Sequence, residues 1–200
     1  MSDTTRPADV LPMSTPADYY DMSRIRPAVQ EALAKINAMG PTFAARAKAV
    51  DDEASFPTAN YKDLADAGFL GLSIPEEFGG WGFTMGEYAM VGAEIGKYCG
   101  ATALTFNMHN SSMAWSRFMY DMPNLTPEEK AEFAPLRARQ FTRAMKERAI
   151  FSQPISEGGQ NWTSKPNQTQ ARAVEGGWKI NGFKKFASLA GYCDYYTIVC

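Results

Sequence analysis

The sequence predicts an α+β protein, in which an all-α N-terminal helical domain is followed by an incomplete antiparallel β-barrel-like domain. Two observations support this fold class. Over most of the first 148 residues, apolar side chains recur at helical spacing behind recognisable capping signals. After Ala149 the chain changes to short runs of β-branched and aromatic residues separated by glycines. We expect residues 1–22 to form an arm, 23–148 the helical domain and 149–200 the start of the β-domain.

The composition favours a folded protein without a strongly charged partner. Hydrophobic residues make up 45% of the 200-residue chain and charged residues 21%, which is enough apolar surface for a substantial core. The formal net charge of −2 would not attract nucleic acid, so we expect no such partner.

Three scattered cysteines and a single histidine do not make a disulfide framework or a metal site. Without a secretory signal or an apolar window of roughly 20 residues, the sequence predicts no membrane span and a cytoplasmic location.

The first 50 residues predict an arm and two helical stretches. Prolines and small polar residues dominate residues 1–20, which is typical of a tail. Ser23 is expected to cap a helix that ends near Met39, because Gly40-Pro41 interrupts the apolar periodicity there. A second stretch follows over residues 43–50.

The next segment predicts a short helix and a buried loop. The helix covers residues 58–67 and is expected to end at Gly68, which suits the left-handed position after a helix. Residues 69–82 are apolar, but glycines and a proline interrupt them. They therefore predict an irregular loop that is packed against the core.

Two capping boxes mark the starts of further helices. Thr84 and Glu87 open one helix, and Thr126 and Glu129 open another, because hydroxyl and carboxylate satisfy each other's backbone donors in this pattern. Between the two, residues 101–119 carry little charge on any face and predict a helix that is buried on most sides.

The last 50 residues predict β-structure. Residues 168–174 and 178–188 are expected to pair as a hairpin, in which Trp178 and Ile180 alternate with polar residues as on a strand with one buried face. A further strand is predicted at 195–200, where the sequence stops. An unfinished β-domain has open edges, so we expect either truncation of a longer protein or completion by a second polypeptide.

No catalytic motif is visible in the residues alone. Glycine-rich dinucleotide and phosphate loops and the nucleophile elbow are absent from the sequence. The single histidine, His109, lies within the apolar helix. It is either a core histidine hydrogen-bonded to a neighbour or a residue beside a cofactor or substrate, and both interpretations remain open.

A resemblance to a known family supplies a function. Residues 64–82 read Leu-Ala-Asp-Ala-Gly-Phe-Leu-Gly-Leu-Ser-Ile-Pro-Glu-Glu-Phe-Gly-Gly-Trp-Gly. This run resembles the stretch L-x-x-x-G-[LF]-x-G-[LI]-x-[VI]-P-E-E-[YF]-G-G-x-G of the acyl-CoA dehydrogenase superfamily. Residues 84–90 and 101–109 resemble the two helices that follow this stretch in the family.

Two later segments resemble the flavin-binding segments of that family. Phe151-Ser-Gln-Pro154 is similar to the family's Ser-Glu-Pro strand, with glutamine in place of the usual glutamate, and a glycine-rich loop follows it. Residues 178–188 are similar to the segment whose last three residues lie along the isoalloxazine. The resemblance therefore implies FAD as the cofactor, bound by Phe151, Ser152, Gln153, Gly158, Gly159, Phe186, Ala187 and Ser188.

The resemblance implies flavin-dependent α,β-dehydrogenation of an acyl-CoA thioester. It places the catalytic carboxylate in a C-terminal four-helix bundle beyond Cys200, so no catalytic residue is assigned and the fragment alone is expected to be inactive. Asn107, Met108 and His109 are expected to form one wall of the substrate cavity. The implied partners are an electron-transfer acceptor and further copies of the chain in a homodimer or homotetramer.

Two alternatives stay open. A flavin-dependent monooxygenase on the same scaffold would use reduced flavin and oxygen and would lack the carboxylate base. A non-catalytic or half-site subunit would need a partner chain to complete its pocket. Fold-level similarity does not choose between these chemistries.

Overall fold

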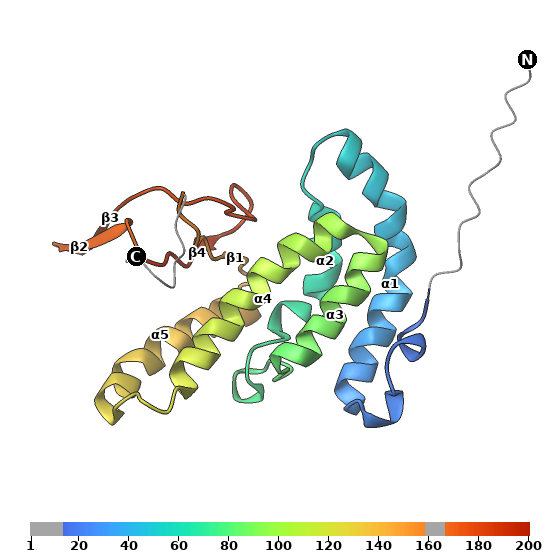
Figure 1. The fold of residues 1–200 in the computed structure, drawn as a ribbon, viewed down its shortest axis with the longest axis horizontal. Coiled ribbons are helices and arrows are strands. Elements are labelled where there is room, and N and C mark those ends of the chain that lie inside the picture. Colours follow the sequence, from blue (N-terminus) through green and yellow to red (C-terminus); the bar gives the residue numbers. More distant parts are fainter. Residues whose placement is uncertain (1–13, 159–166) are drawn as a thin grey trace, which may run out of the picture.

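The computed structural model describes residues 14–158 and 167–200. Its main elements are five α-helices and four short strands, interspersed with 3₁₀ turns (Figure 1). The helices are α1 (Pro27–Asp52), α2 (Thr58–Asp66), α3 (Met85–Tyr98), α4 (Gly100–Asp121) and α5 (Pro127–Lys146). The strands are β1 (Phe151–Ser152), β2 (Gln170–Val174), β3 (Gly177–Asn181) and β4 (Tyr195–Tyr196).

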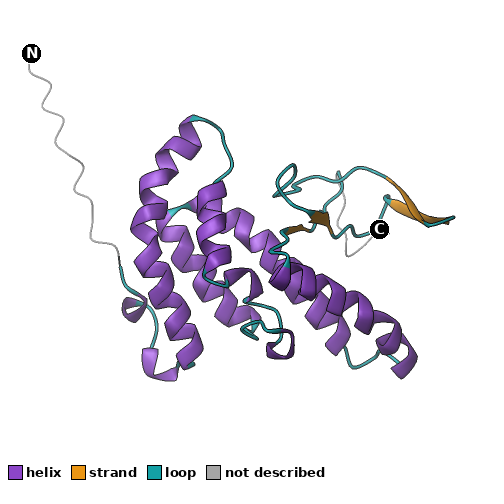
Figure 2. Cartoon of the chain, turned by 180° about the vertical axis from the view of Figure 1, so that it is seen from behind, coloured by secondary structure: helices purple, strands orange, loops and turns teal. Residues whose placement is uncertain are grey.

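The helices form a row in which α3 lies between α1 and α4, and both α5 and β1 contact α4. Figure 2 shows the same arrangement from behind, with the β part on the side of α4 that is remote from α1. Helix α4 is therefore the element that joins the helical core to the β part. Among the described helices, none is long and apolar enough to cross a membrane.

Helix α1 is continuous, so the predicted break at Gly40-Pro41 is wrong. Pro41 lies inside the helix on an exposed position. A proline there removes a backbone hydrogen bond and costs about 3 kcal/mol, but Ile36 and Phe43 on either side are fully buried and outweigh that cost. Gly40 is buried against α3, and a side chain at this position would overlap the ring of Tyr98.

The predicted cap at Ser23 is also wrong. Residues Met22–Arg24 form a 3₁₀ turn, and Asp21 accepts a hydrogen bond from the Ser23 backbone N–H. Helix α1 begins four residues later at Pro27, whose fixed backbone angle suits the first position of a helix. Part of the expected arm, Pro16–Asp18, is a 3₁₀ turn as well.

Both predicted capping boxes are confirmed at the starts of α3 and α5. The hydroxyls of Thr84 and Thr126 accept hydrogen bonds from the backbone N–H groups of Glu87 and Glu129. In return, the two glutamate carboxylates accept hydrogen bonds from the threonine backbone N–H groups at 2.8 Å. Glu87 also pairs with Arg26, which ties the start of α3 to the residue before α1.

The loop between α2 and α3 is irregular and its first part, residues 69–74, is buried, as its composition predicts, whereas Glu76, Glu77 and Gly79 are exposed. It begins after Gly68, which has the expected left-handed φ of 81°. Phe69 and Leu72 are fully buried, and the loop satisfies its own backbone groups, for example from Phe83 N–H to Leu72 O at 2.8 Å. A side chain at Gly80 would overlap the carbonyl oxygen of Ile74, so the loop can fold back on itself only with glycine there.

The β part differs from the prediction in extent, direction and burial. Strands β2 and β3 form the predicted antiparallel hairpin, but β3 ends at Asn181 rather than near Ser188. The strand expected over 195–200 is only two residues long, and β4 pairs with β1 in parallel.

The hairpin has no buried face. Trp178 and Ile180, which the alternation predicts to point into a core, are 68% and 46% exposed. The reason is that none of the elements within residues 14–158 and 167–200 covers either side of the hairpin, since all ten of its strand residues are exposed. The alternation of apolar and polar residues therefore has no partner layer in the described part of the chain.

Candidate functional site

His109 connects three parts of the fold at the centre of α4. Its ring Nε2 lies 2.9 Å from the carbonyl oxygen of Leu70, and its Nδ1 accepts a hydrogen bond from the Phe151 backbone N–H at 3.1 Å. The ring is fully buried, and this burial lowers the pKa of His109 to about 4. The imidazole is therefore neutral, with its proton on Nε2, and both ring nitrogens are occupied by structural hydrogen bonds.

The structure does not bring Asn107, Met108 and His109 to one cavity wall. Successive residues of an α-helix point about 100° apart, so the three side chains face in different directions. Asn107 is exposed and accepts a hydrogen bond from the Tyr88 hydroxyl, whereas Met108 is half-buried. Their role in substrate binding stays a prediction.

The two segments that resemble flavin-binding segments do lie side by side. The Ser152 hydroxyl donates to the carbonyl oxygen of Ser188 at 2.6 Å, although the two residues are 36 positions apart. Close by, the Lys185 backbone N–H donates to the carbonyl oxygen of Ser156 at 2.8 Å. Phe151, Ser152 and Gln153 are buried on this junction, Gly158 is exposed at its edge, and Gly159 lies outside the described residues.

Phe186 is unusually placed for an aromatic side chain. It is 82% exposed and has a left-handed φ of 56°, a conformation that non-glycine residues rarely adopt. Such strain persists only where the surroundings enforce it, and it concentrates at functional sites. Ala187 and Ser188 follow and are half-buried. An exposed aromatic face beside small and hydroxyl-bearing residues fits a flat, polar-edged ring such as isoalloxazine.

An apolar cavity of about 340 Å³ adjoins this junction, and Gln153 is the one described residue of the predicted site that lines it. Helix α4 contributes Trp115 and Met119, and α5 contributes Phe133. The β part closes the remaining side, because the Thr197 backbone N–H donates to the Ser152 carbonyl oxygen at 2.7 Å. The full lining is Trp115, Ser116, Met119, Phe133, Gln153, Ile155, Thr197 and Val199.

The one signal that could have located this cavity is the spacing along α4. Trp115 and Met119 lie one turn apart, on the part of the helix beyond His109. The residues from α5 and from 197–199 carry no recognisable pattern, so only the fold brings them together. Gln153 belongs both to this lining and to the segment of Ser152.

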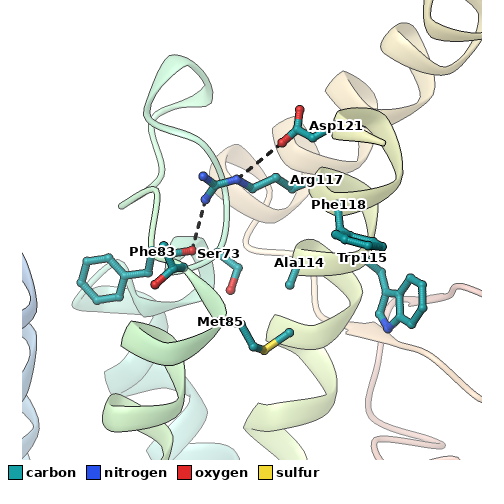
Figure 3. A pocket seen from close by; sticks show the side chains of 9 residues that line it. Ser73, Phe83, Met85, Ala114, Trp115, Arg117, Phe118 and Asp121 are labelled. Atoms are coloured by element: carbon teal, nitrogen blue, oxygen red, sulfur yellow. Dashed lines mark hydrogen bonds and ion pairs between the residues drawn. The ribbon is translucent and has the colours of Figure 1, made fainter. Parts of the chain in front are cut away.

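A larger cavity of about 490 Å³ lies elsewhere, between the loop before α3 and the second half of α4. In Figure 3 the Arg117 side chain reaches toward Phe83 and Asp121, and its Nη1 donates to the carbonyl oxygens of Gly82 and Phe83 at 3.1 Å. Its lining comes from residues 73–85 and 114–121. It shares Trp115 with the 340 Å³ cavity, but none of its lining residues belongs to the segments of Ser152 and Ser188, so we do not assign it to the flavin chemistry.

The described residues hold no group of three or more histidine, cysteine, aspartate or glutamate side chains that could bind a metal ion. The three cysteines are free thiols, of which Cys99 is buried, Cys193 half-buried and Cys200 exposed. The candidate site therefore consists of a junction of two backbone segments, an exposed aromatic ring and an adjoining apolar cavity.

Known protein structures share this fold at low sequence identity. A nitrososynthase from Micromonospora carbonacea var. africana matches 87% of this chain and 42% of its own, with a TM-score of 0.70 and 21% identity. The FMN-bound TdsC from Paenibacillus sp. A11-2 matches 84% of this chain and 39% of its own, with a TM-score of 0.63 and 24% identity. At these identities the similarity establishes the fold alone.

Sequence relatives are more specific. The benzylmalonyl-CoA dehydrogenase of Aromatoleum aromaticum is 26% identical over 90% of this chain and 44% of its own length. The mitochondrial short-chain specific acyl-CoA dehydrogenase of Homo sapiens is 31% identical over 70% of this chain and 32% of its own. The chain thus spans less than half the length of these relatives. Residues 25–139 match the model of the acyl-CoA dehydrogenase N-terminal domain, and since this match covers more than half of the chain, the protein belongs to the acyl-CoA dehydrogenase family.

Proposed function

We propose that this chain is part of an FAD-dependent enzyme that dehydrogenates an acyl-CoA thioester between its α- and β-carbons. The observation that carries the proposal is the junction of Ser152 with Ser188, which presents the exposed ring of Phe186, in a chain of this family. Relatives at 26–31% identity are named as acyl-CoA dehydrogenases or a benzylmalonyl-CoA dehydrogenase. When bound, FAD supplies a two-electron acceptor for substrate oxidation.

The geometry of the junction supports the flavin-facing roles that we propose. Phe186 offers its ring face to the isoalloxazine, and Ala187 leaves room for a close approach. The Ser152 hydroxyl is already used by Ser188, so it orients the second segment and leaves backbone groups for the ring edge. The TdsC structure is described as FMN-bound, so the choice of FAD over FMN is part of our proposal.

We place the acyl chain in the 340 Å³ cavity beside Gln153. Its walls are mainly apolar, which suits an aliphatic or ring-bearing acyl group, and the side chain of Met119 can adapt to different shapes. Among the described residues, no aspartate or glutamate lines this cavity. We therefore assign no catalytic base within residues 1–200.

The remaining expectations are part of the same proposal. The reduced flavin would pass its electrons to a separate acceptor, and the complete protein would be a homodimer or homotetramer in the cytoplasm. Size-exclusion chromatography with light scattering on the complete protein would determine the oligomeric state.

The proposal is tested by the visible spectrum of protein expressed from its complete reading frame, titrated without oxygen with acyl-CoAs of graded length. Bleaching of a bound flavin band near one equivalent supports dehydrogenation and identifies the preferred chain length. A flavin band that no thioester bleaches contradicts the proposal and favours the monooxygenase alternative. Protein that binds no flavin favours the subunit that needs a partner chain.

A further inference from the structure

Three segments that are distant in sequence meet at the ion pair of Glu157 and Lys184. The Lys184 Nζ lies 2.7 Å from Glu157 Oε1 and donates to the carbonyl oxygen of Ile155 at 3.1 Å. The side chains of Lys184 and Glu157 are only 9% and 4% exposed. Salt screens a covered pair of this kind less than it screens a fully exposed pair.

Glu157 also binds the start of the hairpin. Its carboxylate accepts the backbone N–H groups of Gln168 and Thr169 at 2.6 and 2.8 Å. A side chain at Gly182 would overlap Thr169, so the segment after β3 passes directly against this point. The hydrogen bond from Lys184, with those from the backbone, lowers the pKa of Glu157 to about 2, and the carboxylate is therefore charged at neutral pH.

The ion pair also lies next to the segment that carries Phe186. Two anchors flank this residue: Lys184 and the Lys185 N–H hold the chain on one side, and the Ser152–Ser188 hydrogen bond holds it on the other. Phe186 itself is 82% exposed, so little packing fixes its ring. The two anchors, rather than packing of the ring, are therefore the contacts on which we base the maintenance of its unfavourable φ of 56°.

We propose that Glu157 and Lys184 are positioning residues for the flavin, because they fix the segment of Phe186 against the segment of Ser152. This inference rests on the proposed function, since it takes Phe186 as a flavin contact. Neither side chain needs to touch the flavin. A loss of the pair would leave the helical core intact and loosen the placement of residues 184–188.

The test uses the complete protein and four single variants. Lys184→Met removes the charge but keeps an unbranched side chain, Lys184→Arg keeps the charge, and Glu157→Gln keeps the shape of the carboxylate without its charge. Lys179→Met is the matched control, because Lys179 lies on the exposed strand β3 and makes no ion pair with the described residues. The measurements are the FAD dissociation constant, the visible circular dichroism of bound flavin and the melting temperature of flavin-free protein.

We expect Lys184→Met to weaken FAD binding by roughly tenfold and to alter the visible circular dichroism, with little change in the flavin-free melting temperature. Lys184→Arg should recover most of the affinity, and Lys179→Met should match the wild type. A fifth protein, the double variant with Glu157→Gln and Lys184→Met, should lose less FAD affinity than the sum of the two single effects, because both changes remove the same ion pair.

Two results would overturn this inference and leave the proposed function standing. One is that Lys184→Met binds FAD as well as the wild type does, and the other is that the effects of Lys184→Met and Glu157→Gln on FAD affinity simply add. If Lys184→Met does not fold, Glu157→Gln and Lys184→Arg decide, and wild-type FAD affinity and circular dichroism in Glu157→Gln would overturn it. Wild-type protein that binds no flavin overturns the proposed function and this inference with it.

Discussion

The Nδ1 atom of His109 accepts the backbone N–H of Phe151 at 3.1 Å, which fastens the first strand of the β part to the middle of α4. On the other side of the ring, Nε2 donates to the carbonyl oxygen of Leu70 in the buried loop. Protonation of Nδ1 would break the bond to Phe151 and place a charge in the core. The fold therefore depends on a neutral histidine.

This relationship predicts a specific pH dependence of stability. The pKa of His109 is about 4 in the folded protein and about 6.5 in the unfolded chain, so the unfolded chain binds more protons between these values. The stabilisation that the neutral histidine contributes is fully present above pH 6.5 and is lost as the pH falls. The loss of unfolding free energy reaches about 3 kcal/mol by pH 4. Urea unfolding at pH 7.5 to 4.5 should show this loss in the wild type.

His109→Gln supplies the comparison. It should be less stable at pH 7.5 by about 2 kcal/mol, because a buried hydrogen bond is lost or distorted. Its unfolding free energy should also decline less steeply with falling pH. Parallel pH curves for the two proteins would show that His109 is not the group responsible.

The backbone conformation of Phe186 predicts that a substitution there can weaken flavin binding without changing the stability of the protein. Glycine accepts a φ of 56° without strain, so Phe186→Gly should leave the unfolding free energy within about 1 kcal/mol of the wild type. The same change removes the proposed stacking face and should weaken FAD binding by about tenfold. Chemical unfolding and fluorescence titration of the complete protein measure the two quantities. Unchanged FAD affinity would remove Phe186 from the proposed site.

In the loop before α3, the packing around Gly80 predicts that even one added methyl group is not tolerated. Gly80→Ala should destabilise the protein by about 3 kcal/mol, because its Cβ would overlap the backbone carbonyl of Ile74, which cannot move aside like a side chain. Gly92→Ala is the control: Gly92 lies within α3 with open space around it, and alanine there should stabilise the helix by about 1 kcal/mol. Similar thermal unfolding of both variants would contradict the packing of this loop.

The cavity between α4, α5 and the β part predicts a change in substrate preference. Met119→Trp would fill part of its volume and should lower kcat/KM for long acyl-CoAs by about tenfold relative to short ones. Leu104→Trp, on an exposed position of the same helix and outside the cavity, should leave this ratio unchanged. Equal ratios in both variants and the wild type would place the acyl chain elsewhere.

Local sequence signals predicted the elements that local interactions create. The capping boxes of Thr84 and Thr126, the helix end at Gly68 and the turn of the hairpin each involve residues within a few positions of one another. Gly40-Pro41 is the opposite case. Its local preference to end the helix was overcome by the burial of Ile36 and Phe43 and by the close packing of Gly40 on Tyr98, which no short window contains.

The candidate site divides in the same way. The family resemblance named Ser152, Phe186 and Ser188, and the structure brings their two segments together. It did not reveal that His109 is committed to the Leu70 and Phe151 backbones, or that Glu157 and Lys184 join the two segments. Those partners are separated by 27 to 42 residues, and their side chains have no periodic pattern.

By itself, the sequence determined the fold class, most of the helix starts and the family. The fold class and the helix starts depend on residues that are close in sequence, and the family depends on a long continuous motif. Only the tertiary structure decided which side chains share a cavity and which polar groups pair. The physical reason is that a buried hydrogen bond or ion pair is set by how close two segments pack, and packing is a property of the whole core.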